Sequence, residues 1–206
     1  MRQCKIENMK HAISTNLENA KKAFVSISDL LEDKVVGVNE RQTLLIAYFD
    51  ICMEHIQSIH LLVLHKMHGS AFALIRPFYE TYFRALWMLK FASDQEIEAI
   101  RLNNFRFPNM ASKINALDDI YTGTDFFKQI KHSAWSAMCD YTHSGTLQLS
   151  RRWNGDNLEP NYEEGEIIEV LKSTKIILLL FVYTLLKEHG YQSDAEKVNN
   201  LILTST

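Results

Sequence analysis

Apolar residues recur at three- and four-residue steps along most of the chain, a pattern that is typical of amphipathic helices. The first such stretch covers residues 10–33, and the second, over residues 40–67, is apolar on most of its surface. Asn39 is placed to cap the second helix, and Ser93 with Glu96 forms a capping box for a later one. Because the chain has only 7 Gly and 3 Pro, few turns interrupt these patterns.

The pattern predicts further helices along the rest of the chain. They cover residues 68–88, 93–107, 125–143, 161–188 and 193–203, and the less regular stretch 109–125 holds a short helix that ends near residues 121–124. Pro77 falls inside the 68–88 stretch, where it leaves the carbonyl of Ala73 without its helical donor. We expect a kink there, because the charged residues around Pro77 keep one helical phase. The alternative is that a new helix starts at Pro77.

These elements predict an all-α protein, a single-domain bundle of five to seven helices over residues 1–206. Apart from one charged stripe, nearly every side chain around the 68–88 helix is apolar. We therefore expect it at the centre of the bundle, against the 125–143 helix and the 165–188 helix.

Three charged residues interrupt this central helix. Arg76, Glu80 and Arg84 follow one another at four-residue steps, so they lie on one stripe together with Trp87. Charges on a buried helix must be paired internally or must face a cleft. In one interpretation Glu80 holds both arginines for a ligand anion, and in the other the three residues form a structural ion-pair network.

A second segment carries the remaining candidate residues. They are Trp135, Asp140, Tyr141, His143, Arg151 and Arg152. Asp140 lies one turn before His143, so its carboxylate can orient the imidazole of an acid/base group. The adjacent arginines can bind a phosphate or a carboxylate bidentately, and the ring of Trp153 beside them offers a surface for stacking. The alternative is that His143 hydrogen-bonds at a helix end while the arginines pair with the acidic C-terminal part.

The candidate site is therefore assigned in two groups. We predict His143, Asp140 and Arg76 as catalytic residues. We predict ligand-binding roles for the others: Glu80, Arg84, Arg151, Arg152, Trp135 and Tyr141.

Composition narrows the classes of function. Residues 101–152 hold seven Arg and Lys against four Asp and Glu, a basic middle that can meet an anion, whereas the part from 153 onward is acidic. Three cysteines without C-x-x-C spacing fit a cytoplasmic protein rather than a disulfide scaffold. No metal site or cofactor motif is expected, and the longest apolar run, residues 176–186, is too short to span a membrane.

Two segments of the chain resemble an uncharacterised family of bacterial helical proteins. The shared pattern is Arg76-Pro77-x-x-Glu80, then Trp87, and later Asp140-Tyr141-Thr142-His143-Ser144-Gly145. The layout is similar to HEPN-type helical bundles, many of which are metal-independent ribonucleases in toxin–antitoxin or phage-defence systems. The resemblance implies RNA or a nucleotide as ligand, a homodimer, and His143 as the acid/base group.

The chain departs from the HEPN pattern at one point. In that pattern an Arg precedes a His by four to six residues, and no Arg here has a His at that spacing. An arginine must therefore meet His143 across space for the ribonuclease interpretation to hold. The competing interpretation is a non-catalytic helical interaction or dimerisation module, in which Arg76, Glu80 and Arg84 form a structural network.

Overall fold

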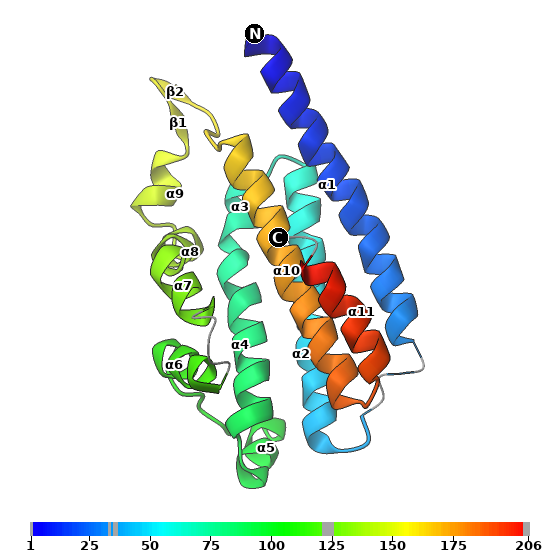
Figure 1. The fold of residues 1–206 in the computed structure, drawn as a ribbon. Helices are drawn as coiled ribbons and strands as arrows, with labels where there is room; N and C mark the ends of the chain where they lie inside the picture. The colour runs from blue at the N-terminus through cyan, green and yellow to red at the C-terminus, as the bar shows by residue number, and fades with distance from the viewer. Residues whose placement is uncertain (1, 33, 35–36, 121–125, 204–206) are drawn as a thin grey trace.

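Helices packed lengthwise make up nearly all of the described structure (Figure 1). This computed structural model describes residues 2–32, 34, 37–120 and 126–203. In chain order the helices and strands are α1 (Arg2–Leu31), α2 (Glu40–Leu64), α3 (His68–Ala73), α4 (Ile75–Phe91), α5 (Asp94–Arg101), α6 (Met110–Ile120), α7 (Phe126–Ser133), α8 (Trp135–Thr142), α9 (Thr146–Ser150), β1 (Trp153–Asn154), β2 (Asn157–Leu158), α10 (Glu164–Glu188) and α11 (Gln192–Leu203). The predicted all-α class is confirmed. Among the helices of the described residues, none combines the length and apolar content needed to cross a bilayer.

Helix α4 lies at the centre of the molecule, as expected for the 68–88 stretch. Helices α2, α6, α8 and α10 all pack against it. In Figure 1, helices α6 to α9 lie along one side of α4, and α1, α2, α10 and α11 lie on the other. Phe78 and Phe83 of α4 have no exposed surface, so the apolar part of this helix joins both sides into one buried cluster.

The predicted 68–88 helix is divided into α3 and α4, and the break falls at Leu74 rather than as a kink at Pro77. Pro77 therefore lies in the first turn of α4, where a helix needs no backbone donor. The carbonyl of Ala73, which lacks the N–H that a residue other than proline would supply at position 77, accepts a hydrogen bond from the hydroxyl of Thr142 at 3.1 Å. The break thus docks the end of α8 onto the start of α4.

The predicted 125–143 helix is also two helices, α7 and α8, which are separated by Ala134. Residue 125 lies outside the described residues. Because of these breaks, the described residues form more helical segments than the five to seven expected. The long helices α2, α4 and α10 lie within stretches that the apolar pattern predicted to be helical.

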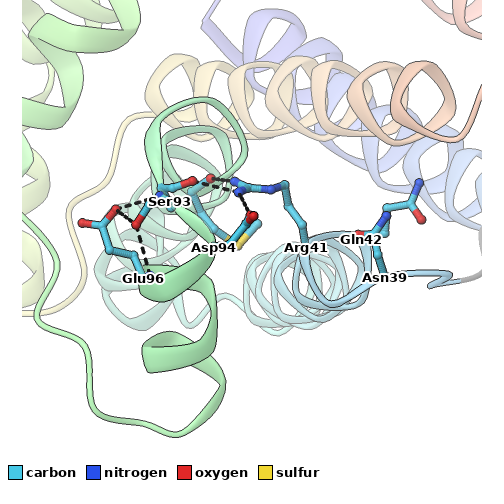
Figure 2. A network of polar contacts seen from close by, with 8 residues as sticks. Asn39, Arg41, Gln42, Ser93, Asp94 and Glu96 are labelled. Atoms are coloured by element: carbon cyan, nitrogen blue, oxygen red, sulfur yellow. Dashed lines mark hydrogen bonds and ion pairs between the residues drawn. The ribbon is translucent and has the colours of Figure 1, made fainter.

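The helix caps predicted at Asn39 and Ser93 are confirmed. The side chain of Asn39 accepts a hydrogen bond from the backbone N–H of Gln42 at 2.9 Å, which caps α2. Ser93 and Glu96 form the capping box of α5, with Glu96 accepting from the N–H of Ser93 at 2.7 Å. Figure 2 shows both caps from close by.

Arg41, in the first turn of α2, binds the start of α2 to the end of α4 (Figure 2). Its guanidinium donates to the carbonyl oxygens of Met88 and Ala92, at 2.8 Å each, and to the carboxylate of Asp94 at 3.1 Å. The last carbonyls of a helix have no partner within the helix, and a cation is favoured at that end of the helix dipole. Arg41 therefore satisfies the C-terminus of the helix that carries the candidate site.

Candidate functional site

Arg76, Glu80 and Arg84 form a charged ladder along α4. The Nε of Arg76 donates to Glu80 Oε1 at 2.8 Å, and Nη2 of Arg84 donates to Glu80 Oε2 at 3.1 Å. The side chains are 23%, 19% and 43% exposed for Arg76, Glu80 and Arg84 respectively. Both ion pairs join residues of the same helix, so the ladder does not tie two helices together by itself. It holds the two guanidinium groups in place at the surface.

The structure places His143 against the first arginine of this ladder. Nη1 of Arg76 lies 2.7 Å from Nε2 of His143, and the imidazole is exposed. Arginine only donates hydrogen bonds, so Nε2 must be the acceptor and the ring proton must lie on Nδ1. An arginine thus meets His143 across space, 67 residues apart in the sequence. We refer to Arg76, Glu80, Arg84, Trp135 and His143 as the ladder site.

The position of His143 follows from the way α8 ends. Thr142, its neighbour, binds the carbonyl of Ala73, one turn before Pro77. After His143, Ser144 adopts a left-handed conformation with φ of 54°, and the N–H of Gly145 donates to the carbonyl of Asp140 at 2.8 Å. This closes the helix with a Schellman-type turn. The imidazole is therefore held at a tightly defined helix end.

Asp140 does not orient the imidazole, contrary to the expectation from its spacing. Its carboxylate accepts from the backbone N–H of Gln148 at 3.1 Å, in the first turn of α9. A Cβ at position 145 would overlap that carboxylate, so Gly145 is required for the close approach. Asp140 fixes the turn that follows His143 and acts on the site only through the backbone.

Trp135 completes the surroundings of Arg76. The guanidinium carbon of Arg76 lies 5.5 Å from the centroid of the indole ring, within the range of a cation–π contact. The same indole stacks on Phe83 of the core, with a centroid distance of 6.3 Å. Arg76 is consequently held by a carboxylate, an aromatic face and an imidazole.

The structure does not bring Arg151, Arg152 and Tyr141 to His143. Arg151 pairs with the carboxylate of Glu166 in α10, as in the alternative in which the arginines pair with the acidic part. Tyr141 is buried, and burial raises the pKa of its phenol. The predicted site residues therefore fall into two groups, one around Arg76 and one around Arg151.

Lys113 belongs to the surroundings of the ladder and was missed by sequence reasoning. Its residue surface is only 2% exposed, and its ammonium donates to the carbonyl of Pro108. The ring of Phe107 has two cations nearby, with its centroid 5.6 Å from Lys113 Nζ and 5.6 Å from Arg84 Cζ. Burial, and next the charge of Arg84, lowers the pKa of Lys113 to about 8. The available signal was its position one turn before the buried Leu117, on the apolar stripe of α6.

The lowered pKa of Lys113 predicts a dependence of stability on pH. Between about pH 8 and the ordinary lysine value of 10.5, the unfolded chain binds more protons at this position than the folded chain, so stability rises with pH. We expect Lys113→Met to remove about 1–2 kcal/mol of the stability gained between pH 7 and pH 9.5. Urea unfolding at the two pH values measures the gain. Lys22→Met, at an exposed position of α1, is the control and should behave like the parent chain.

The ladder site is an open surface rather than an enclosed cavity. A hollow of about 400 Å³ lies elsewhere, between α1 and α2, and acidic side chains from Asp50 and Glu54 line it. That lining repels an anion. In the described part of the chain, no three His, Cys, Asp or Glu residues are grouped so that they could hold a metal ion. Unlike that hollow, the ladder site presents partly exposed cations, a setting that favours an anion over a cation.

Comparison with known proteins assigns the chain to a family. No curated protein and no solved structure matches it. A family model matches residues 49–203, which cover α3 to α11 and most of α2 and include every residue of the ladder site. The matched segment is well over half of the 206 residues, and the chain belongs to the family of unknown function DUF6988.

Proposed function

We propose that this protein binds RNA by its phosphate groups at the ladder site and cleaves it without a metal ion. The observation that carries the proposal is the exposed contact of 2.7 Å between Arg76 and the unprotonated Nε2 of His143. This contact places a proton acceptor beside a fixed cation, which is the pair that acid/base cleavage of a phosphodiester requires.

The charge around this pair favours an anion. Arg76, Arg84 and Lys113 lie around a single carboxylate, that of Glu80. Glu80 uses both of its oxygens on the arginines and leaves the outer N–H groups of both guanidinium groups for a ligand. The exposed setting suits a long flexible ligand such as single-stranded RNA better than a small molecule that needs an enclosing pocket.

The proposed reaction uses groups of this chain for each step. Phosphate oxygens take over the N–H of Arg76, which frees Nε2 of His143 to accept the proton of the ribose 2′-hydroxyl. The 2′-oxygen then attacks the phosphorus, and the bond from phosphorus to the 5′-oxygen of the next nucleotide breaks. Arg76 and Arg84 stabilise the added negative charge, and the leaving oxygen receives a proton from the imidazolium. The products are a 2′,3′-cyclic phosphate and a free 5′-hydroxyl.

A non-catalytic interaction module is the second candidate, and one observation favours it. Arg76 contacts Trp135 and His143 of the α8 region while it is paired with Glu80 of α4, so these contacts also join two helices. Such a network stabilises the fold without any chemistry. The two candidates predict different effects of removing Arg76. If the site is catalytic, RNA cleavage falls; if the network is only structural, the stability of the fold changes and there is no cleavage to lose.

RNA cleavage tests the proposal. A fluorescently labelled single-stranded RNA, incubated with the full chain in EDTA, should give products that end in a 2′,3′-cyclic phosphate. We expect Arg76→Ala to lower the cleavage rate by about 10²-fold, because one charge-stabilising donor is lost. Lys22→Ala removes a positive charge from an exposed position of α1 and should cleave at the parent rate.

Two results contradict the proposal in different ways. RNA binding that needs Arg76 without any cleavage would leave RNA binding alone as the function. If the chain neither binds nor cleaves RNA, a structural role for Arg76, Glu80 and Arg84 is the candidate that remains.

The biological setting is part of the same proposal. An HEPN-like ribonuclease that acts as a homodimer in a toxin–antitoxin or phage-defence system is what the resemblance implies. The Arg76–His143 contact supports the ribonuclease reaction, and a toxin–antitoxin or phage-defence role follows from the resemblance rather than from this contact.

A further inference from the structure

A second group of polar side chains gathers around Gly69, at the start of α3. A Cβ at this glycine would lie 2.7 Å from Nη2 of Arg152 and 2.9 Å from the hydroxyl of Tyr162. The ring of His68 lies 5.7 Å from that of Tyr162, centroid to centroid. We refer to His68, Gly69, Arg152 and Tyr162 as the Arg152 cluster.

The polar atoms of the Arg152 cluster lack partners. Nδ1 of His68 and the hydroxyl of Tyr162 are both buried and make no hydrogen bond. Arg152 is exposed, and its side chain makes neither a hydrogen bond nor an ion pair with any residue that the structure describes. Its neighbour Arg151 is already paired with Glu166, the nearby carboxylate. A buried polar atom without a partner is costly, so a ligand that supplies partners here is stabilised.

An anion supplies what each of these groups needs. A phosphate oxygen that enters beside the guanidinium of Arg152 can accept from it and from the hydroxyl of Tyr162. The imidazole of His68 donates through Nδ1 when that nitrogen carries the proton. Gly69 allows the guanidinium of Arg152 and the hydroxyl of Tyr162 to lie against the start of α3, because a Cβ at this position would collide with both.

The Arg152 cluster lies close to the ladder site. Gly69 and Arg76 are seven residues apart along α3 and α4, which corresponds to roughly 10 Å at about 1.5 Å per residue. A stacked nucleic-acid strand advances about 3.4 Å per nucleotide, so a strand of about three nucleotides spans this distance. Gln148 also joins the two regions, because it donates to the carbonyl of Gly69 and its backbone binds Asp140.

We propose that the Arg152 cluster is a second phosphate subsite, which binds the same RNA strand about three nucleotides from the bond placed at the ladder site. This inference rests on the proposed function and narrows its substrate class to single strands longer than a dinucleotide. Trp153, which follows Arg152, is 49% exposed and makes no ring contact with another described residue, so a base of the strand stacks on it.

Tryptophan residues report on the two subsites separately. Trp135 contacts Arg76 at the ladder site, Trp153 neighbours Arg152, and Trp87 is buried in the core. The full chain labelled with 5-fluorotryptophan therefore gives three ¹⁹F resonances, which Trp→Phe variants assign. The probes are 2′-O-methyl RNA oligonucleotides of two and of five nucleotides, which lack the 2′-hydroxyl and are not cleaved.

We expect the pentanucleotide to shift the resonances of Trp135 and Trp153, and the dinucleotide to shift that of Trp135 alone. Arg152→Ala should abolish the shift of Trp153 and weaken pentanucleotide binding by about tenfold, with a decrease of about 0.7 in the slope of log affinity against log salt. Dinucleotide binding should stay within about twofold of the parent chain, because the ladder site is intact. Lys22→Ala is the matched control for the loss of one positive charge.

The failure of this inference is distinguishable from that of the proposed function. A shift of Trp135 without a shift of Trp153 would overturn the second subsite and leave the ladder site standing. A shift of Trp153 alone would overturn the ladder site as the place of binding. A shift of Trp153 that persists in Arg152→Ala would also overturn the subsite, since Arg152 would then not hold the strand.

Discussion

Substitution of His143 by alanine is expected to lower the rate of RNA cleavage by about 10²–10⁴-fold, the range that a general acid–base group contributes. The imidazole is exposed and contacts Arg76 through Nε2, so its loss should leave the melting temperature almost unchanged. The backbone role of residue 143 at the end of α8 is kept by alanine. Single-turnover cleavage and thermal unfolding, followed by circular dichroism, measure the two effects.

Two companion variants sharpen this experiment. His143→Gln keeps a hydrogen-bond acceptor for Arg76 but cannot exchange a proton near neutral pH, so it should be as inactive as the alanine variant. His11→Ala removes an exposed histidine from α1 and should keep the parent rate. Equal rates for the parent chain and His143→Ala would mean that the imidazole has no part in the chemistry.

Substitution of Glu80 by alanine is expected to lower the free energy of unfolding by about 1–3 kcal/mol. The variant removes the shared partner of Arg76 and Arg84 and leaves these two like charges, eight residues apart on the same helix, without the carboxylate between them. A fully buried pair would cost more, about 3–5 kcal/mol, but the exposed fractions of 19% to 43% let water solvate the freed groups. Urea unfolding gives the difference.

A matched variant separates charge from shape at this position. Glu80→Gln keeps the size and an acceptor oxygen, so it should lose less stability than Glu80→Ala. Unfolding midpoints that agree for all three chains would show that water already satisfies the arginines and that the ladder contributes nothing to the fold.

The regular parts of the fold could be predicted because they depend on local patterns. The stripe of apolar residues placed α2, α4 and α10, and the caps at Asn39 and Ser93 depend on residues three apart. The breaks at Leu74 and Ala134 were not predicted, because neither residue disfavours a helix. The break at Leu74 lies three residues before Pro77, close to the interruption that the proline predicts, whereas the break at Ala134 has no such local signal.

The candidate site could be predicted only as far as single helices determine it. The spacing of Arg76, Glu80 and Arg84 predicted their ion pairs, and the structure contains both. The partner of Asp140 depends on a turn of the chain that spacing does not specify, so its role was assigned incorrectly. Lys113 carries no motif, and its significance comes from burial alone.

The hydrogen bonds of Arg41 to the end of α4 affect which fragment of this protein is expected to fold on its own. The segment shared with the family begins at Phe49, after Arg41 and all of α1. Yet α1 packs along α10, where Ala20 and Ile27 are buried, and Arg41 binds the last carbonyls of the helix that carries the ladder. We expect a chain trimmed to residues 49–203 to expose the apolar face of α10 and to lose the hydrogen bonds that Arg41 donates to Met88 and Ala92. The unit that folds stably is therefore expected to be longer than the segment that the family model matches.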